Sequence, residues 1–161
     1  MLFRSSAVAN GGTLYYLQYP RTAAEIDSFT PKEKRTLEIA PHGIEDIKAG
    51  MRGAVDFGTA KRANDPSETI LGKTGTCTDF KSSSHMGWFG SFNEVGSHKL
   101  VVVVMLASTA KTGGGVAAGV AGEIYRNLSV QNYFVADNVP KKPVLPEVIV
   151  SSPCCSQSRD R

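Results

Sequence analysis

The sequence predicts an α+β fold, in which an antiparallel sheet of four or five strands packs against helices. Two β-rich runs, 86–92 (MGWFGSF) and 99–106 (KLVVVVML), are separated by the short segment NEVGSH, as expected for a hairpin between central strands. Two other segments, 44–57 and 115–128, repeat apolar residues at three- or four-residue steps. This spacing is typical of helices that lie on a sheet.

The first third of the chain contains three expected elements. Residues 1–12 are expected to include the end of a helix, because the paired glycines that close this segment supply the left-handed backbone found at helix ends. Tyr and Leu alternate along residues 13–19 as in a half-buried strand, which stops at Pro20. Thr-Pro-Lys-Glu at 30–33 matches a capping box with proline at the first helical position and predicts a short helix.

A longer helix and a strand are expected next. Residues 44–57 carry apolar side chains on one stripe and should form a helix that ends at Gly58. The residues of this stripe are Ile44, Ile47, Met51 and Val55. After a turn-rich connection, residues 69–78 are expected to form a strand interrupted by glycines.

The last expected element is a helix over residues 115–128. Its apolar residues recur every four positions among Ala and Gly, and this small face predicts very close packing on the sheet. These apolar residues are Val116, Val120, Ile124 and Leu128. Residues 1–134 are thus expected to form the folded domain, whereas the proline-rich residues 135–161 cannot fill a core and are expected to be a disordered extension.

The composition excludes several classes of protein. Hydrophobic residues make up 41% of the chain and charged residues 20%, which is within the range of globular domains. The longest strictly apolar run, 100–107, is far too short to cross a bilayer, and no signal peptide is recognisable. The net charge of +3 is dispersed. Its only dense group, Lys32, Lys34 and Arg35, indicates an exposed helical turn rather than binding to nucleic acid.

The cysteines argue against a metal site and against a disulfide framework. Cys77, Cys154 and Cys155 are odd in number and lack the CxxC spacing that zinc ligands commonly have. The histidines lie far from any cysteine pair, so each is expected to be a surface or polar-core residue. We therefore expect neither a metal ion nor another cofactor.

The tripeptide Gly-Lys-Thr at 72–74 belongs to two different chemical devices. One is the phosphate-binding loop, GxxxxGK[ST], which stands between a strand and a helix. Here the first required glycine is replaced by Ser67, and the residues after the tripeptide cannot form the required helix. The second Lys-Thr-Gly, at 111–113, lacks both required glycines, since Met105 and Ala110 occupy their positions. A nucleotide-binding loop is therefore disfavoured.

The other device is a strand that binds the end of a peptide. An extended edge strand pairs with a peptide laid antiparallel beside it, and a lysine on the strand holds the terminal carboxylate of that peptide. Lys73 is suited to hold the carboxylate, and the hydroxyls of Thr74 and Thr76 are suited to face the same ligand. Gly75 leaves room for close approach of the ligand to the backbone.

The segments around this strand follow a recognisable order. AVANGG comes first, followed by IKAGMRGAVDFGTA, ILGKTGT, GWFGSF, an all-valine strand and TGGGVAAGVAGEIY. Over residues 5–128, this order and spacing resemble the C-terminal part of penicillin-binding protein transpeptidase domains. The resemblance implies a partial β-lactamase- or transpeptidase-like fold within residues 1–134. It also implies D,D-transpeptidase chemistry, in which peptidoglycan cross-links form through an acyl-enzyme.

The family resemblance also implies roles for individual residues. In this family an SxxK sequence carries the nucleophile, an SxN sequence places a hydroxyl and an amide across the cleft, and KTG lies on the strand. By resemblance, Lys73 and Thr74 bind the substrate carboxylate, while Thr76 adds a hydroxyl and its N–H is one of two oxyanion donors. The implied ligand is a peptidoglycan stem peptide or a β-lactam.

Two sequences in this chain match the SxxK and SxN motifs by chance. Ser108-Thr109-Ala110-Lys111 spells SxxK and Ser91-Phe92-Asn93 spells SxN, but both follow the KTG strand. A nucleophile must open a buried helix, whereas Ser108 leaves a valine strand for a glycine-rich loop. Ser91 falls within the strand of the GWFGSF segment. Neither serine is expected to be catalytic.

The chain thus resembles the KTG half of a transpeptidase domain. The SxxK and SxN sequences are expected to precede AVANGG outside this chain, so that the chain alone is inactive. Three origins agree with this pattern: a fragment of a penicillin-binding protein, one half of a split enzyme completed by a separate N-terminal half, or a non-catalytic remnant that binds penicillin or peptide. The resemblance implies a periplasmic or cell-membrane-associated location.

Three residues near the strand need a separate interpretation. Cys77 shares a face with Lys73 and Gly75 if the strand alternates regularly, but no His or Lys lies at a fixed nearby spacing to activate its thiol, which favours a packing role. His85 is expected to have a structural role rather than one in proton transfer. Trp88 and its neighbour Phe89 are expected to belong to the core.

Overall fold

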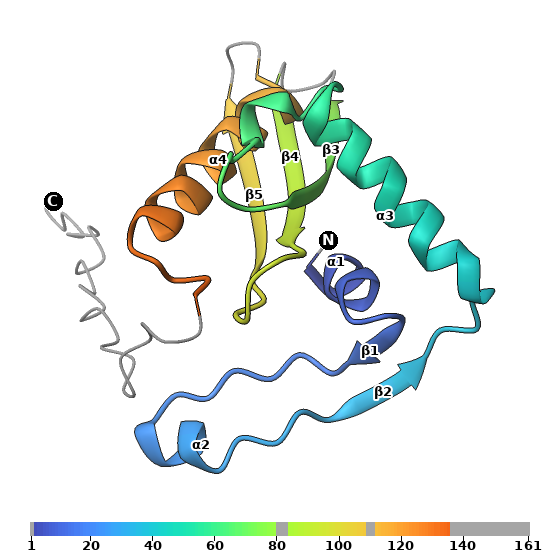
Figure 1. The fold of residues 1–161 in the computed structure, drawn as a ribbon, viewed down its shortest axis with the longest axis vertical. Coiled ribbons are helices and arrows are strands. Elements are labelled where there is room, and N and C mark those ends of the chain that lie inside the picture. The colour runs from blue at the N-terminus through green and yellow to red at the C-terminus, as the bar shows by residue number, and fades with distance from the viewer. Residues whose placement is uncertain (1, 80–83, 109–111, 136–161) are drawn as a thin grey trace, which may run out of the picture.

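The computed structural model describes residues 2–79, 84–108 and 112–135. A three-stranded sheet and a separate two-stranded ladder lie on opposite sides of helix α1 (Figure 1). The strands are β1 (Thr13–Tyr15), β2 (Glu33–Thr36), β3 (Ile70–Asp79), β4 (Ser84–Asn93) and β5 (Val101–Ser108). The helices are α1 (Leu2–Ala9), α2 (Ala23–Asp27), α3 (Pro41–Asp56) and α4 (Gly114–Val130), with a 3-10 turn η1 (Lys61–Ala63). The predicted α+β fold class is confirmed, whereas the predicted tail lies outside the described residues except for Val135.

The central sheet consists of two successive antiparallel pairs in the order β3-β4-β5. The pairing of β3 with β4 is regular from Ile70, opposite Asn93, to Asp79, opposite Ser84. The predicted hairpin between the second and third of these strands is confirmed. The predicted number of four or five strands is wrong for the described residues, because β1 pairs with β2 and does not join this sheet.

Helix α4 covers one face of the sheet through its smallest residues. Ala117, Ala118 and Ala121 are completely buried. The close packing predicted for this helix is therefore confirmed, but the stripe predicted to make the contact is wrong. Val116 and Val120 remain 43% and 41% exposed. An alanine face brings the helix backbone nearest to the sheet, and the larger side chains are left on the outer side.

The opposite face of the sheet is covered only in part. Leu71 of β3 and Phe92 of β4 are buried together with Met51 of α3, and Val8 and Ala9 of α1 pack against them. This smaller core attaches α1 and α3 to the end of the sheet where β3 begins. Farther along β3 the same face is more open, as the side chains near Lys73 show below.

Helix α3 confirms most of the predicted apolar stripe. Ile44, Met51 and Val55 are buried, whereas Ile47 is 41% exposed. Helix α1 ends as predicted, because Gly11 adopts a φ of +83° and Gly12 a φ of +117°. The helix end predicted from the paired glycines is thus confirmed, and so is most of the buried face predicted from the apolar stripe.

The short helix predicted at residues 30–33 is wrong. Residues 33–36 form β2, whose Arg35 lies opposite Leu14 of β1. The only helix between β1 and β2 is α2, and the Thr22 side chain caps it by accepting a hydrogen bond from the N–H of Glu25. A capping-box pattern gives no helix here, because no apolar stripe follows it and the segment gains strand pairing instead.

Candidate functional site

Strand β3 lies at an edge of the central sheet and carries the residues Lys73 to Thr76 in its middle. One edge of β3 pairs with β4, and among the described residues no strand pairs with the other edge. An unpaired edge presents backbone N–H and C=O groups that can pair with an extended peptide. The predicted strand and its position at an edge are therefore suited to peptide binding.

The side chains of these residues alternate between the two faces of the sheet. Thr74 and Thr76 lie on the face covered by α4, where Thr74 Oγ1 is 2.7 Å from Thr59 Oγ1. The N–H of Gly114, in the first turn of α4, donates to Thr76 Oγ1 over 3.2 Å. Because the register with β4 is regular, Lys73 and Gly75 lie on the opposite face.

Lys73 is exposed, and its ammonium folds back onto its own strand. Lys73 Nζ donates to the carbonyl oxygen of Thr74 over 2.6 Å, and no carboxylate among the described residues pairs with it. A lysine without an acidic partner on an open strand edge is free to exchange this carbonyl for an anionic ligand. The structure thus brings the four predicted residues to one edge, with the ammonium and the hydroxyls on different faces.

The two glycines of β3 differ in the space that a side chain would have. At Gly72 an added Cβ would lie 2.2 Å from the Phe89 ring, so the packing excludes a side chain there. At Gly75 an added Cβ would meet only Trp88 Cβ at 3.5 Å, an ordinary van der Waals distance. The fold therefore explains Gly72, whereas Gly75 leaves open space beside the strand.

The glycine of the second Lys-Thr-Gly stands at the start of helix α4. Lys111 lies outside the described residues, and Gly113 is the N-cap residue of α4. Gly113 and Gly114 pack directly against the sheet: an added Cβ at Gly114 would lie 2.6 Å from Thr74 Cβ. An added Cβ at Gly87 of β4 would lie 2.4 Å from the Gly113 carbonyl oxygen. The start of α4 therefore packs on the face of the sheet that carries Thr74 and Thr76, and it helps to hold β3 in place.

This contact predicts a strong effect of a single methyl group. Gly87→Ala should lower the free energy of unfolding by about 1–3 kcal/mol, because the new Cβ overlaps backbone atoms that cannot move without shifting α4. Gly50→Ala is the matched control: its Cβ would have nothing within 4 Å, and alanine is the better helix former in α3. Urea unfolding of both variants measures the difference, and equal midpoints would contradict the packing described here.

Ser91 and Ser108, the serines of the chance matches to SxN and SxxK, both lie in strands of the central sheet. Ser91 is completely buried, and its hydroxyl donates to the Val102 carbonyl over 3.1 Å. It also lies 3.1 Å from the hydroxyl of Tyr125, whose pKa burial raises to about 12. Asn93 holds the β4–β5 turn through its side-chain amide, which donates to the carbonyl of Val95. Ser108 ends β5, and the lysine of its motif lies outside the described residues.

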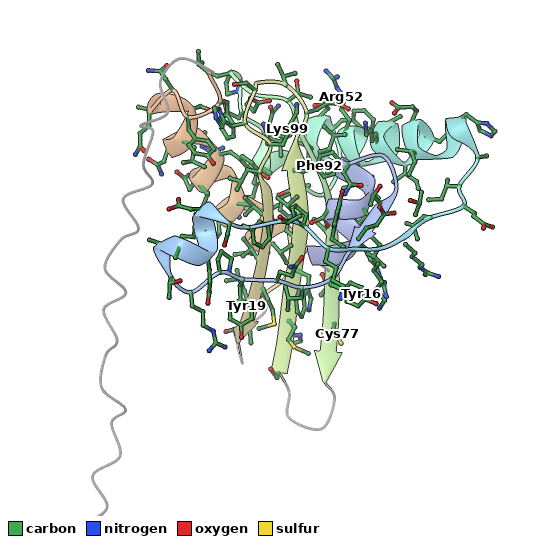
Figure 2. The ribbon with its side chains drawn as sticks, turned by 90° about the horizontal axis from the view of Figure 1, so that it is seen from below. Tyr16, Tyr19, Arg52, Cys77, Phe92 and Lys99 are labelled. Atoms are coloured by element: carbon green, nitrogen blue, oxygen red, sulfur yellow. The ribbon has the colours of Figure 1, made fainter. Side chains whose placement is uncertain are left out.

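Residues farther along β3 lie where the regular register places them. Cys77 is exposed, so the packing role expected for it is wrong, and it lies opposite Met86 on the face of Lys73, near the end of β3 (Figure 2). His85 Nδ1 is 3.2 Å from Thr78 Oγ1 in a cross-strand pair, which agrees with a structural role. Phe89 is completely buried, as predicted for the core, whereas Trp88 is only half-buried and lies outside it.

The sequence interpretation missed the partners of the two threonines. Thr59 lies 15 residues before Thr74, and Gly114 lies 38 residues after Thr76. Neither residue belongs to a periodic pattern that points to β3. The only local signal was the glycine-rich start of α4, which predicted close packing without naming the strand it contacts.

Metal binding and membrane insertion find no support within the described residues. They contain no group of three or more His, Cys, Asp or Glu side chains that could hold a metal ion. None of their helices has both the length and the apolar composition needed to cross a bilayer.

Comparisons with known proteins agree with this geometry. The chain is similar in structure to the D,D-transpeptidase domain of a peptidoglycan glycosyltransferase from Eggerthella lenta, with a TM-score of 0.58 and 18% identity over 82% of this chain. It is also similar to the transpeptidase domain of the FtsI4 D,D-transpeptidase from Legionella pneumophila, with a TM-score of 0.50 and 21% identity over 78% of this chain. The chain spans only 32% and 42% of the length of these two structures.

The family comparison is more direct than the structural one. None of the curated protein sequences matches this chain. The family model described as penicillin binding protein transpeptidase domain matches residues 4–126, which include most of α1, most of α4 and every element between them. The chain therefore belongs to the penicillin-binding protein transpeptidase domain family.

Proposed function

We propose that this chain provides the substrate-binding strand of a D,D-transpeptidase that cross-links peptidoglycan. The observation that carries this proposal is the sequence Lys-Thr-Gly-Thr in the middle of β3, at a sheet edge to which no other strand of the described residues is paired. The ligand is the stem peptide of peptidoglycan or a β-lactam, which lies antiparallel to β3. Such an enzyme works at the periplasmic or outer side of the cell membrane, where its substrate lies.

Each residue of the strand has a distinct role in this proposal. Lys73 leaves the Thr74 carbonyl and pairs with the carboxylate of the ligand, as a charge-assisted hydrogen bond is stronger than a neutral one. Gly75 leaves the ligand backbone room to approach the strand. The N–H of Thr76 donates to the oxyanion that forms on the attacked carbonyl.

The two threonine hydroxyls remain able to donate to an anion. Thr76 Oγ1 already accepts from the N–H of Gly114, so its own O–H is available for the carboxylate. Thr74 and Thr59 share one hydrogen bond, in which either hydroxyl is able to donate. With Thr59 as donor, the O–H of Thr74 is directed to the ligand, and Thr59 acts as a positioning residue.

The nucleophile comes from polypeptide other than residues 1–161. Ser91 is buried within the sheet and holds a structural hydrogen bond, and Ser108 lies at the end of a strand instead of opening a helix. The short span of this chain relative to the two structural neighbours supports the same interpretation. We propose that the chain by itself is inactive, either as a fragment or as one half of a split enzyme.

A fusion protein tests this function. The upstream half of a related transpeptidase domain, with its SxxK and SxN sequences, is joined to the N-terminus of this chain. The fusion should be acylated by a fluorescent penicillin in a form that survives denaturation, and replacing the SxxK serine by alanine should abolish the labelling. A fusion that unfolds cooperatively but is never labelled would contradict the enzymatic proposal and favour a non-catalytic remnant.

A further inference from the structure

A groove lies between α1 and the β1–β2 ladder, and it shares no residue with Lys73–Thr76. Its volume is about 580 Å³, within the range typical of sites that bind another molecule. Ala7 is almost completely buried at its floor, and Val8, Leu14 and Leu37 are half-buried around it. The floor of the groove is thus apolar.

The rim of the groove carries positive charge only. Arg4, Lys34 and Arg35 line it and are exposed, and no acidic residue of the described part of the chain lines it. None of these three cations forms an ion pair with a carboxylate among the described residues. The Nζ of Lys34 lies 5.6 Å from the centre of the Tyr16 ring.

Three other basic residues of the chain do have a carboxylate partner. Lys48, Arg52 and Arg126 each lie within 4 Å of a carboxylate oxygen of a neighbouring Glu or Asp. What distinguishes the groove is the combination of an apolar floor with three basic side chains that have no carboxylate partner among the described residues.

Exposed apolar side chains extend the groove along the residues that follow β1. Tyr16 is 48% exposed and Leu17 is 61% exposed, and both line the groove (Figure 2 labels Tyr16). Contiguous exposed apolar surface with a charged border is typical of an interaction site. A nucleic acid duplex would gain nothing from the apolar floor, since it binds basic surfaces mainly through its phosphates, which need only the cations.

We propose that this groove receives an acidic amphipathic segment of the polypeptide that supplies the nucleophile. This inference rests on the proposed function, in which most of a transpeptidase domain lies outside this chain. The apolar side chains of that segment fill the floor, and its carboxylates pair with Arg4, Lys34 and Arg35. Covering these cations without acidic partners would leave partly desolvated charges unpaired, which is costly.

The first experiment measures binding to the full chain with a synthetic probe. The probe is a blocked amphipathic helical peptide of about 14 residues made of leucine and glutamate, and its control has lysine in place of glutamate. The acidic peptide should bind and shift the NMR signals of Ala7, Val8 and Leu14, whereas the basic peptide should not. Equal binding of both peptides, or shifts elsewhere only, would overturn the proposal.

Two charge-matched triple variants locate the contribution of the groove. Arg4→Gln with Lys34→Gln and Arg35→Gln should weaken binding of the acidic peptide about tenfold or more, since each ion pair contributes a factor of roughly two to five. The control variant changes two other arginines and one lysine that line no groove: Arg21→Gln, Lys61→Gln and Arg62→Gln. Equal loss in both variants would mean that only net charge matters, and would contradict a docking site.

The fusion protein separates failure of this inference from failure of the proposed function. In the fusion, the groove variant should unfold at a lower urea concentration and be acylated more slowly than the control variant. In the chain alone, both variants should unfold at the same concentration, because the cations are unpaired there. An acylated fusion that is indifferent to the groove variant would overturn this inference and leave the function intact. If peptide binding depends on the groove but the fusion is never acylated, the proposed function would be contradicted and binding by the groove would stand.

Discussion

The chain alone is expected to form no covalent adduct with a fluorescent penicillin that survives denaturation. Acylation needs a serine hydroxyl and a general base within hydrogen-bond reach, beside donors for the oxyanion. Ser91 is completely buried and donates to the Val102 carbonyl, so a β-lactam cannot approach it. Ser108 ends β5, and nothing in its position resembles the start of a buried helix.

The measurement is a denaturing gel with an intact transpeptidase as positive control. Under conditions in which the control is labelled to completion, labelling of this chain should be at background. An adduct that maps by mass spectrometry to any serine would show that the nucleophile lies in this chain after all. An adduct at Ser108 in particular would show that the SxxK match is real, and the proposed dependence on other polypeptide would then be wrong.

The strands of the central sheet were predictable because their signal is local. β-branched and aromatic residues run along β4 and β5, and the polar turn between them leaves one simple pairing. The same local reasoning failed at residues 30–33, where capping residues are present without an apolar stripe to hold a helix on a core. Strand pairing with β1 is a longer-range gain that the local pattern does not contain.

The orientation of α4 was not predictable from hydrophobic spacing. The valines at 116 and 120 form the more apolar stripe, yet Ala117 and Ala121 face the sheet. The reason is the glycine pair at the start of the helix, which brings its first turns so close to β3 and β4 that only small side chains fit there, whereas the large side chain of Tyr125 is buried farther along. Periodicity ranks faces by hydrophobicity, whereas the structure selects the face by size.

The position of the candidate site on an edge strand was predictable, but the contacts that support its side chains were not. Lys73 and the residues after it were found through a short motif whose chemistry requires an edge strand, and β3 is such a strand in the described part of the chain. Thr59 and Gly114 hold the threonine hydroxyls from distant positions in the sequence. Contacts of this kind depend on tertiary packing, and no pattern in a single sequence reveals them.

A second large effect is expected for Lys73 in the fusion that carries the upstream half of a transpeptidase domain. Lys73→Ala should slow acylation by penicillin roughly ten- to a hundred-fold, because loss of a charge-assisted contact costs about 1.5–3 kcal/mol. The ammonium orients the carboxylate and thereby fixes the carbonyl at the nucleophile. Thr74→Val keeps the β-branched shape but removes the hydroxyl shared with Thr59, and should have an intermediate effect.

The lysine of the second Lys-Thr-Gly is the matched control for this effect. Lys111 lies between β5 and α4 in the sequence and not on β3, so Lys111→Ala should change the acylation rate by less than about twofold. Both substitutions remove one positive charge, so a long-range electrostatic effect would slow the two variants alike, whereas a direct contact at β3 slows only one. The decisive quantity is the ratio of their acylation rates in the same fusion. Equal rates, or a larger defect at Lys111, would mean that β3 is not the substrate-binding strand.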